Sequence, residues 1–292
     1  MENIGSTSTI ELVRPGVVLK QPIIFKTKGL ADKVDLCFSV EPLILEKLGH
    51  HPRIVEYLGK QGRGLLLGQA SHSNLQVYID NHPSTDLRQR KIWCRQLTEA
   101  LAYIHSHGVV HSDLRPKNIL VHETSPGSRD LVLCDFGGST CDELGLDGGC
   151  LPDGPFYSPT FGVQSTPALD IFGLGSLFYT ILTGYWPYRS CPGPPETIDE
   201  KMDYEKEVAQ AFHQGKYPDV TQVVGGSVIL GCWMKQYLSA EEVLLGLDRE
   251  MPISEDAADI KYAGHISMFL LVAISVTVLI ASTYIIIRRL PR

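Results

Sequence analysis

The chain lacks the sequence features of several protein classes. Its 292 residues include seven cysteines, but none forms a Cys-x-x-Cys pair, and the ten histidines do not join them at zinc-ligand spacing. We therefore expect reduced thiols rather than a disulfide framework, and no zinc site. The N-terminal stretch has no basic patch followed by an apolar run, so we expect no cleavable secretory signal.

Positive charge is also scarce. The formal net charge is -7, with 26 Lys and Arg residues against 33 Asp and Glu residues. A general nucleic-acid-binding protein would normally carry a basic face, so we expect no nucleic-acid partner. Hydrophobic residues make up 43% of the chain, which is enough for a sizeable folded core.

The most informative stretch runs from His111 to Gly138. It begins H-S-D-L-R-P-K-N-I-L-V and ends L-V-L-C-D-F-G-G, so Asp113 precedes Asn118 by five residues and Asp135 follows an apolar run. A carboxylate can accept the proton of a hydroxyl nucleophile, while an amide oxygen and a second carboxylate are hard ligands for magnesium. The pattern therefore predicts a site for phosphate and metal chemistry.

This stretch resembles the catalytic and metal-binding loops of eukaryotic-type protein kinases, H-R-D-L-x-x-x-N and D-F-G. The resemblance implies an α+β, two-lobed fold over residues 1–247. A small antiparallel β lobe with one helix would occupy about 1–68, and a larger, mainly helical lobe about 71–247. It also implies ATP and Mg²⁺ as cofactors and a protein as the phosphate acceptor.

The resemblance assigns roles to individual side chains. Asp113 would orient and deprotonate the acceptor hydroxyl, and Arg115 would contact the transferred phosphate in place of the usual lysine. Asn118 and Asp135 would bind magnesium. His111 is expected to pack beside D-F-G as a structural residue rather than to carry a proton.

The glycine-rich loop of the family is poorly preserved. Only Gly5 is retained, with Thr7 and Ile10 where further glycines would fall. Glycines let backbone amides approach phosphate closely, so their loss should weaken or reshape nucleotide binding. The alternative is that the small Ser and Thr residues keep the loop usable.

A β-branched run, Val17–Lys20, is similar to the V-A-I-K of the family. Lys20 would then contact the α- and β-phosphates and pair with a glutamate on the next helix. The alternative is a surface lysine at the end of a strand, since Lys26 and Lys28 lie close by in the sequence.

Apolar spacing predicts a helix within residues 35–48. Glu41 lies where the ion-pairing glutamate should fall, and Glu46 is the alternative. Because proline is tolerated only in the first turn of a helix, Pro42 predicts that the helix begins close to Glu41.

Further elements follow from the same patterns. Ile54–Leu58 and Leu65–Leu67 are predicted to be the last strands of the small sheet. The backbone of Gln69 and Ala70 would then meet the adenine edge, as the resemblance implies. Apolar residues three or four apart predict a long helix from Asp86 to His107.

The stretch from Ser139 to Pro159 would be the activation segment. It is rich in glycine and proline, and we expect its hydroxyl groups to be exposed and to form ordinary turns. These hydroxyl-bearing residues are Ser139, Thr140, Tyr157 and Ser158.

Two departures from the family bear on regulation. Ser112 replaces the arginine that clamps a phosphorylated activation segment, so activity should not depend on that phosphorylation. Thr160 replaces a glutamate, and its usual arginine partner is missing from residues 232–243. Pro116, in contrast, favours Ser/Thr specificity over tyrosine specificity.

An uncharged run of 22 residues, 266–287, predicts a transmembrane helix. At about 1.5 Å per residue it would be about 33 Å long, enough to cross a hydrocarbon core of about 30 Å. An acidic linker (248–265) precedes it and a short basic tail (288–292) follows. We expect a tail anchor with the kinase domain in the cytosol, on the mitochondrial outer membrane, the peroxisome or the endoplasmic reticulum.

The sequence thus predicts a membrane-anchored, ATP- and Mg²⁺-dependent protein kinase directed at serine or threonine. One alternative is a pseudokinase scaffold at a membrane, which the altered glycine loop and Ser112 favour. A small-molecule kinase is the other, although the activation segment argues against it. The sequence leaves the oligomeric state open.

Overall fold

The computed structural model forms a compact unit, Met1–Pro252, followed by a second unit, Ile253–Arg292. The predicted membrane span, 266–287, and Gly5 lie outside the residues that the structure describes. Among the described residues, no helix combines the length and apolar character needed to cross a membrane. The described residues are 3–4, 7–149, 151–152, 154–162 and 164–253.

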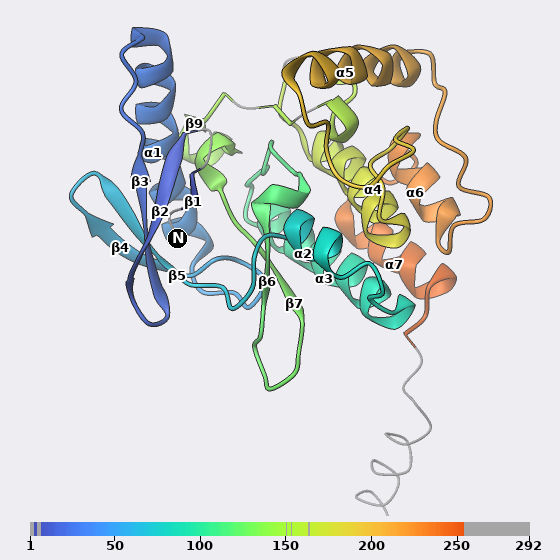
Figure 1. Ribbon diagram of the computed structural model, residues 1–292, viewed down its shortest axis with the longest axis horizontal. Helices are drawn as coiled ribbons and strands as arrows, with labels where there is room; N and C mark the ends of the chain where they lie inside the picture. Colours follow the sequence, from blue (N-terminus) through green and yellow to red (C-terminus); the bar gives the residue numbers. More distant parts are fainter. Residues whose placement is uncertain (1–2, 5–6, 150, 153, 163, 254–292) are drawn as a thin grey trace, which may run out of the picture. The chain divides into compact units, whose positions relative to one another are not determined.

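The N-terminal part of the compact unit is an antiparallel sheet with one long helix, α1 (Lys28–Leu48), packed against it (Figure 1). The strand order is β1-β2-β3-β5-β4. Gly16 and Gly62 have positive φ angles, 82° and 61°, which let the chain reverse tightly between neighbouring strands. The strands are β1 (Asn3–Ile4), β2 (Ser8–Arg14), β3 (Val17–Pro22), β4 (Tyr57–Gln61) and β5 (Gly64–Gly68).

The predicted start of the helix near Glu41 is wrong. Helix α1 begins at Lys28, and Pro42 lies inside it as a buried residue. A proline within a helix removes one backbone hydrogen bond, but the flanking residues Val40, Ile44 and Leu45 are buried and hold the helix together by packing.

The strand predicted at Ile54–Leu58 is displaced, because β4 begins at Tyr57. Ile54 instead forms an isolated parallel bridge with Leu133, and the Val55 N–H donates to the Leu133 carbonyl at 2.9 Å. The Ile54 and Val55 side chains are buried in the core, so burial rather than sheet pairing explains why this stretch is apolar.

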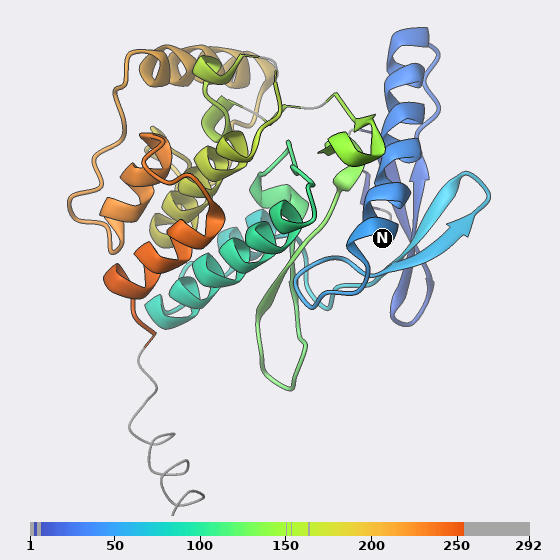
Figure 2. The ribbon, with the colours of Figure 1, turned by 180° about the vertical axis from the view of Figure 1, so that it is seen from behind.

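The C-terminal part is mainly helical (Figure 2). Side chains cap five of its helices by accepting an N–H of the first turn, which satisfies a donor that would otherwise lack a partner. The capping residues are Asn74, Asp86, Thr166, Thr197 and Ser239. The helices are α2 (Leu75–Asn81), α3 (Leu87–Ser106), α4 (Pro167–Thr183), α5 (Ile198–His213), α6 (Gly226–Trp233) and α7 (Ala240–Glu250).

Helix α4 is the centre of this part. Twelve of its residues are buried, and it packs against α3 and α6. Gly175 allows that approach, since a Cβ there would lie 2.8 Å from the Cβ of Cys232. The long helix predicted from Asp86 to His107 is confirmed as α3, with those two residues as its caps. Helix α7 continues three residues into the predicted acidic linker.

Two short antiparallel ladders lie between the sheet and the helices. They are β6 (Ile119–His122) with β7 (Asp130–Leu133), and β8 (Thr140–Cys141) with β9 (Leu146–Asp147). Short 3-10 turns lie before, between and after these ladders in the chain: η1 (Pro116–Asn118), η2 (Phe136–Gly138), η3 (Asp142–Leu144), η4 (Gly154–Phe156) and η5 (Pro159–Phe161).

Candidate active site

The first ladder brings the predicted site residues together. Ile119 pairs with Leu133, so Asn118, which precedes β6, and Asp135, which follows β7, lie at the same end of the ladder. The Cys134 N–H donates to the Asn118 carbonyl at 3.0 Å and extends this pairing. The register of two apolar strands therefore positions both predicted magnesium ligands.

A buried ion pair joins the sheet to helix α1. Lys20 Nζ lies 2.6 Å from Glu41 Oε2 and 2.7 Å from Asp135 Oδ1. Lys20 and Glu41 are almost completely buried, whereas the Asp135 side chain is 38% exposed. The expected Lys20–Glu41 pair therefore forms, while the alternative, Glu46, is exposed on the same helix.

Charge stabilises this arrangement. Burial by itself lowers the pKa of Lys20, but Asp135 and Glu41 outweigh it and hold that pKa above its ordinary value. Burial likewise raises the pKa of Asp135, yet Lys20 outweighs it and holds that pKa below its usual range. For Glu41 burial dominates over Lys20, so its pKa is raised. Lys20 is therefore charged, and Asp135 is a carboxylate at neutral pH.

The predicted base, Asp113, lies in a buried polar cluster. Asn118 Nδ2 donates to both the Asp113 carbonyl and Asp113 Oδ2, each at 2.9 Å. Arg115 Nη2 also donates to Asp113 Oδ2, at 2.9 Å. The structure thus brings the three predicted catalytic side chains into direct contact, with the Asp113 carboxylate at the centre.

His111 fixes the backbone beside that base. Its Nε2 lies 3.0 Å from the Cys134 carbonyl, and its Nδ1 accepts the Asp113 N–H at 3.3 Å. These contacts require the neutral tautomer that carries its proton on Nε2. Its ring also meets the ring of Phe136 edge-on at 5.0 Å. The predicted structural position of His111 beside D-F-G is confirmed.

The neutral state of His111 predicts a pH-dependent stability. Burial lowers its pKa below the ordinary value of about 6.5, so the unfolded chain takes up this proton at higher pH than the folded chain. The stability that neutral His111 contributes to the folded state is fully present above about pH 6.5. It is lost as the pH falls below that value, by up to about 1.4 kcal/mol per pH unit.

Urea unfolding at pH 7.5, 6.5 and 5.5 measures this effect. His111→Gln should show a shallower loss of unfolding free energy below pH 6.5 than the unchanged protein. The pKa of His51 is also lowered by burial, but His51 is present in both proteins and cancels in the comparison. If the unfolding free energy falls equally steeply with pH in the two proteins, buried His111 is not the neutral group that causes this dependence.

Asp170 on α4 anchors the catalytic loop. Its carboxylate accepts the N–H of His111 at 2.7 Å and that of Ser112 at 3.0 Å, and it lies 3.0 Å from His105 Nε2. Ser112 has a φ of 68°, an unfavourable conformation for a serine. The two hydrogen bonds to Asp170 compensate for this strain and fix the turn that leads to Asp113.

The expectation of exposed hydroxyls in the activation segment is wrong for Ser139 and Ser158, which are both buried. Ser139 Oγ donates to the His111 carbonyl at 3.0 Å, and Ser158 Oγ accepts the Thr160 N–H as the cap of η5. Both hydroxyls are buried because the backbone near them supplies hydrogen-bond partners.

Backbone pairing orders the first half of this segment. Thr140 and Val110 exchange two hydrogen bonds of 3.0 Å. Glu143 in η3 also pairs with Lys47 of α1 at 2.6 Å, although its carboxylate is mostly exposed. This contact between the segment and α1 was not predicted, because the two residues lie 96 positions apart and match no motif.

The segment after β5, which contains Gln69 and Ala70, is the predicted hinge. The Gln69 N–H donates to the Gly16 carbonyl at 2.9 Å, so this donor does not face a ligand. Neither the N–H nor the C=O of Ala70 makes a hydrogen bond within the described residues. The Ala70 backbone groups are therefore available to the edge of a base. Gly5 lies outside the described residues.

The donor set suits magnesium that arrives with a nucleotide. Asn118 uses its amide nitrogen on Asp113, which leaves its oxygen as a ligand, and Asp135 adds a partly exposed carboxylate. No group of three or more His, Cys, Asp or Glu side chains among the described residues could hold a metal alone. Magnesium typically takes one or two carboxylates and fills its remaining positions with phosphates and water.

Comparison with known proteins agrees with this geometry. The family model described as "Protein kinase domain" matches residues 26–227, which is more than half of the chain. The match begins after Lys20, so the family model does not bear on the predicted role of Lys20. The support for that role is the ion pair that Lys20 forms with Glu41 and Asp135.

Curated relatives are similar over parts of the chain. Mouse "Ribosomal protein S6 kinase alpha-2" is 34% identical over 219 residues, which cover 70% of this chain and 29% of the relative. Rat "Serine/threonine-protein kinase SBK2" is 34% identical over 158 residues, 48% of this chain and 42% of the relative. The chain thus spans less than half the length of these curated relatives.

Proposed function

The chain belongs to the protein kinase family, and from this premise we propose that it transfers the γ-phosphate of ATP to a hydroxyl of a protein. The observation that carries the proposal is the buried contact of Lys20 with both Glu41 and Asp135. In protein kinases the corresponding ion pair and metal-binding aspartate must both be in place for phosphate transfer.

Each residue then has a physical task in this proposal. Lys20 would hold the α- and β-phosphates, while Asn118 and Asp135 would hold magnesium, which neutralises charge on the phosphates. The Asp113 carboxylate would accept the proton of the attacking hydroxyl. Arg115, which contacts Asp113 Oδ2, would place positive charge next to the transferred group.

We propose serine or threonine as the acceptor. Pro116, at the start of η1, supports this specificity through the family resemblance. The relatives named above are a ribosomal protein S6 kinase and a serine/threonine-protein kinase, and the second of these names agrees with it.

A pseudokinase is the second candidate. It is supported by Thr7 and Ile10 at the positions of two loop glycines, and by Thr160 in place of the usual glutamate. A membrane scaffold that binds a partner without phosphate transfer would need the fold but not the full set of charged side chains. The intact set at Lys20, Glu41, Asp113, Asn118 and Asp135 favours the enzyme.

Nucleotide binding separates these candidates first. ATP at 100 times its dissociation constant should stabilise the protein by about 2.7 kcal/mol, and the thermal unfolding midpoint should rise. The rise should require magnesium and should disappear in Asp135→Asn. An absence of any rise at millimolar ATP with magnesium would contradict the proposed enzyme and leave the pseudokinase.

Residues 266–287 are proposed to anchor the protein in a membrane, with the kinase domain in the cytosol. Their 22 uncharged residues support this, and the three arginines that follow would stay in water. Extraction of membranes with alkaline carbonate tests the anchor. The full chain should remain in the membrane pellet, and its release into the supernatant would contradict the anchor.

A further inference from the structure

Helix α6 is followed by a lysine in an unfavourable backbone conformation. Lys235 has a φ of 57°, in the left-handed region that favours glycine. Its N–H donates to the Cys232 carbonyl at 3.3 Å, and the Gln236 N–H donates to the Gly231 carbonyl at 2.9 Å. These two hydrogen bonds form a Schellman motif, in which glycine is the usual residue at the position of Lys235. A lysine in this strained position indicates that its side chain has a role.

The ammonium group of Lys235 lies over the ring of Phe161. Its Nζ is 3.8 Å from the ring centroid, and a cation–π interaction acts within about 6 Å. Within the described residues, no Asp or Glu side chain forms an ion pair with Lys235. The Phe161 ring is therefore the group that attracts this cation in the described part of the chain.

Phe161 lies in η5, the 3-10 turn at the end of the activation segment. Its ring meets the ring of Phe172 on α4 edge-on at 5.7 Å, and Phe172 meets Phe212 on α5 edge-on at 4.9 Å. Both of these partner rings are buried, so they connect Phe161 to the core. Lys235 adds a contact from the loop between α6 and α7.

The same two regions contain a departure from the family. Thr160, next to Phe161, replaces a glutamate, and the arginine that usually pairs with this glutamate is missing from residues 232–243. The usual ion pair therefore cannot join η5 to the loop after α6. The contact between Lys235 and Phe161 joins the same two regions with one residue from each.

We propose that Lys235 is a positioning residue, which holds η5 on the helical part through a cation–π interaction in place of the ion pair of the family. This contact is called the Lys235 tether below. The inference rests on the proposed function only where it concerns phosphate transfer, since the tether itself does not require catalysis.

The tether acts close to the support of the catalytic loop. Phe172, which the Phe161 ring contacts, lies between Asp170 and Gly173 on α4. The Asp170 carboxylate accepts two N–H groups of the turn that leads to Asp113. A Cβ on Gly173 would lie 3.3 Å from the Cβ of Leu114, the next residue of that loop. A loosened η5 should therefore weaken the binding of an acceptor peptide beside Asp113 rather than slow the chemical step.

Hydrogen exchange of the full chain in a mild non-ionic detergent, followed by mass spectrometry, tests the tether. The amides of Phe161 and Gly162 report on η5, because they donate to the Ser158 and Pro159 carbonyls at 3.0 and 3.2 Å. Lys235→Asn removes the cation, and asparagine tolerates the left-handed conformation. These amides should exchange about threefold faster in Lys235→Asn. Lys235→Arg should stay within about 1.5-fold of the unchanged protein, because it keeps a cation over the ring.

Two further variants separate the tether from other effects of the lysine. In the Phe161→Leu background, Lys235→Asn should change the exchange rate by less than about 1.5-fold, since the cation has already lost its ring. Lys216→Asn is the matched control, because Lys216 is an exposed lysine in the loop after α5 and the change of charge is the same. It should leave the exchange of η5 unchanged.

Peptide kinetics test the role of the tether in phosphate transfer. In Lys235→Asn, the KM for a serine peptide should rise about threefold while kcat stays within about twofold, because the catalytic side chains are unchanged. Faster exchange of η5 with an unchanged KM would overturn the positioning role.

The tether is overturned if η5 exchanges equally fast in Lys235→Asn and the unchanged protein, or if Lys235→Arg behaves like Lys235→Asn. It is also overturned if Lys235→Asn has its full effect in the Phe161→Leu background. Exchange is measured without ATP, so it decides whether the tether exists even if the protein transfers no phosphate.

Discussion

Asp113→Asn is expected to lower the rate of phosphate transfer by about 10²–10⁴-fold, the usual contribution of a general acid or base. The amide cannot take the proton of the acceptor hydroxyl, and it removes the negative charge that Arg115 and Asn118 contact. Transfer of radioactive phosphate from ATP to a serine peptide measures the effect.

The rate loss should occur without loss of nucleotide binding. Lys20 and Asp135 hold the phosphates and metal in this account, so ATP with magnesium should still raise the unfolding midpoint of Asp113→Asn. Asp32→Asn is the control, because Asp32 is exposed on α1, far along the chain from the catalytic loop. A rate within threefold of the unchanged protein for Asp113→Asn would show that Asp113 is not the base.

Lys20→Met should lower the free energy of unfolding by about 3–5 kcal/mol, because it leaves the buried Glu41 carboxylate without its partner. Glu41 is only 1% exposed, so water cannot replace the ammonium group. Urea unfolding measures the loss. The double variant Lys20→Met/Glu41→Gln should recover much of it, since no buried charge then remains unpaired at that position.

An exposed ion pair provides the matched control. Arg63 and Asp35 pair on the surface, with side chains 64% and 59% exposed. Arg63→Met should therefore change the free energy of unfolding by less than about 1 kcal/mol. If Lys20→Met costs no more than Arg63→Met, the Lys20–Glu41 contact does not stabilise the fold as described.

The sequence was sufficient to predict the catalytic cluster because its residues are close together in the chain. Asp113, Arg115 and Asn118 lie within six positions, and the apolar runs that flank Asn118 and Asp135 pair as strands. Lys20 and Glu41 lie far from this stretch, and only the family resemblance linked them to it. The structure joins all of them through hydrogen bonds that no local pattern specifies.

The errors have physical causes that a local pattern does not reveal. Pro42 lies inside α1 because tertiary packing compensates for the missing hydrogen bond. Ile54 resembles a strand residue because it is buried, yet it bridges to Leu133 rather than to the sheet. Ser139 looks like an exposed turn residue, but the nearby His111 carbonyl accepts its hydroxyl inside the core.

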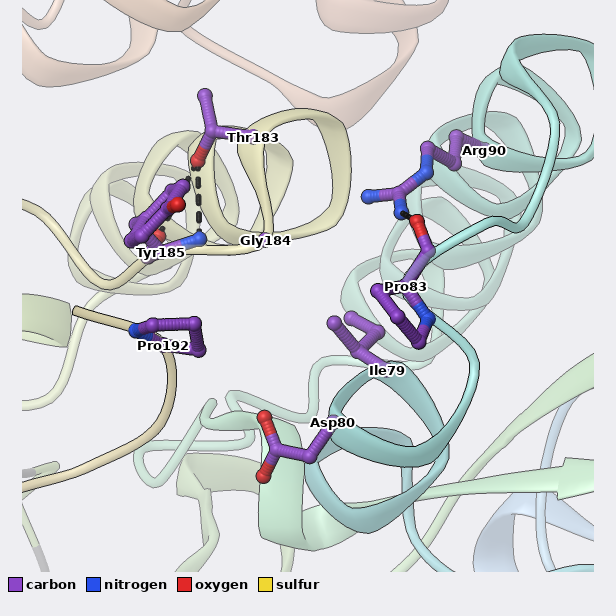
Figure 3. A pocket seen from close by; sticks show the side chains of 8 residues that line it. All are labelled: Ile79, Asp80, Pro83, Arg90, Thr183, Gly184, Tyr185 and Pro192. Carbon is purple, nitrogen blue, oxygen red and sulfur yellow. Dashed lines mark hydrogen bonds between the residues drawn. The ribbon is translucent and has the colours of Figure 1, made fainter.

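The pocket in the helical part, which Asp80 helps to line (Figure 3), was not predicted either. Its lining comes from residues 79–90, in α2 and the start of α3, and from residues 183–192, at and after the end of α4. Gln76 and Trp186 form the hydrogen bond that connects these segments, and they are 110 positions apart. A site built from such distant residues becomes visible only in the folded structure.

Phosphate transfer by the full chain is the decisive measurement for the proposed kinase activity. The protein should move the γ-phosphate of ATP to the hydroxyl of a serine peptide when magnesium is present. It should not do so when magnesium is chelated, or when alanine replaces the serine. Asp113→Asn should reduce this transfer by at least 100-fold. No transfer by the unchanged protein, despite magnesium-dependent ATP binding, would contradict the proposed kinase activity and identify a nucleotide-binding pseudokinase.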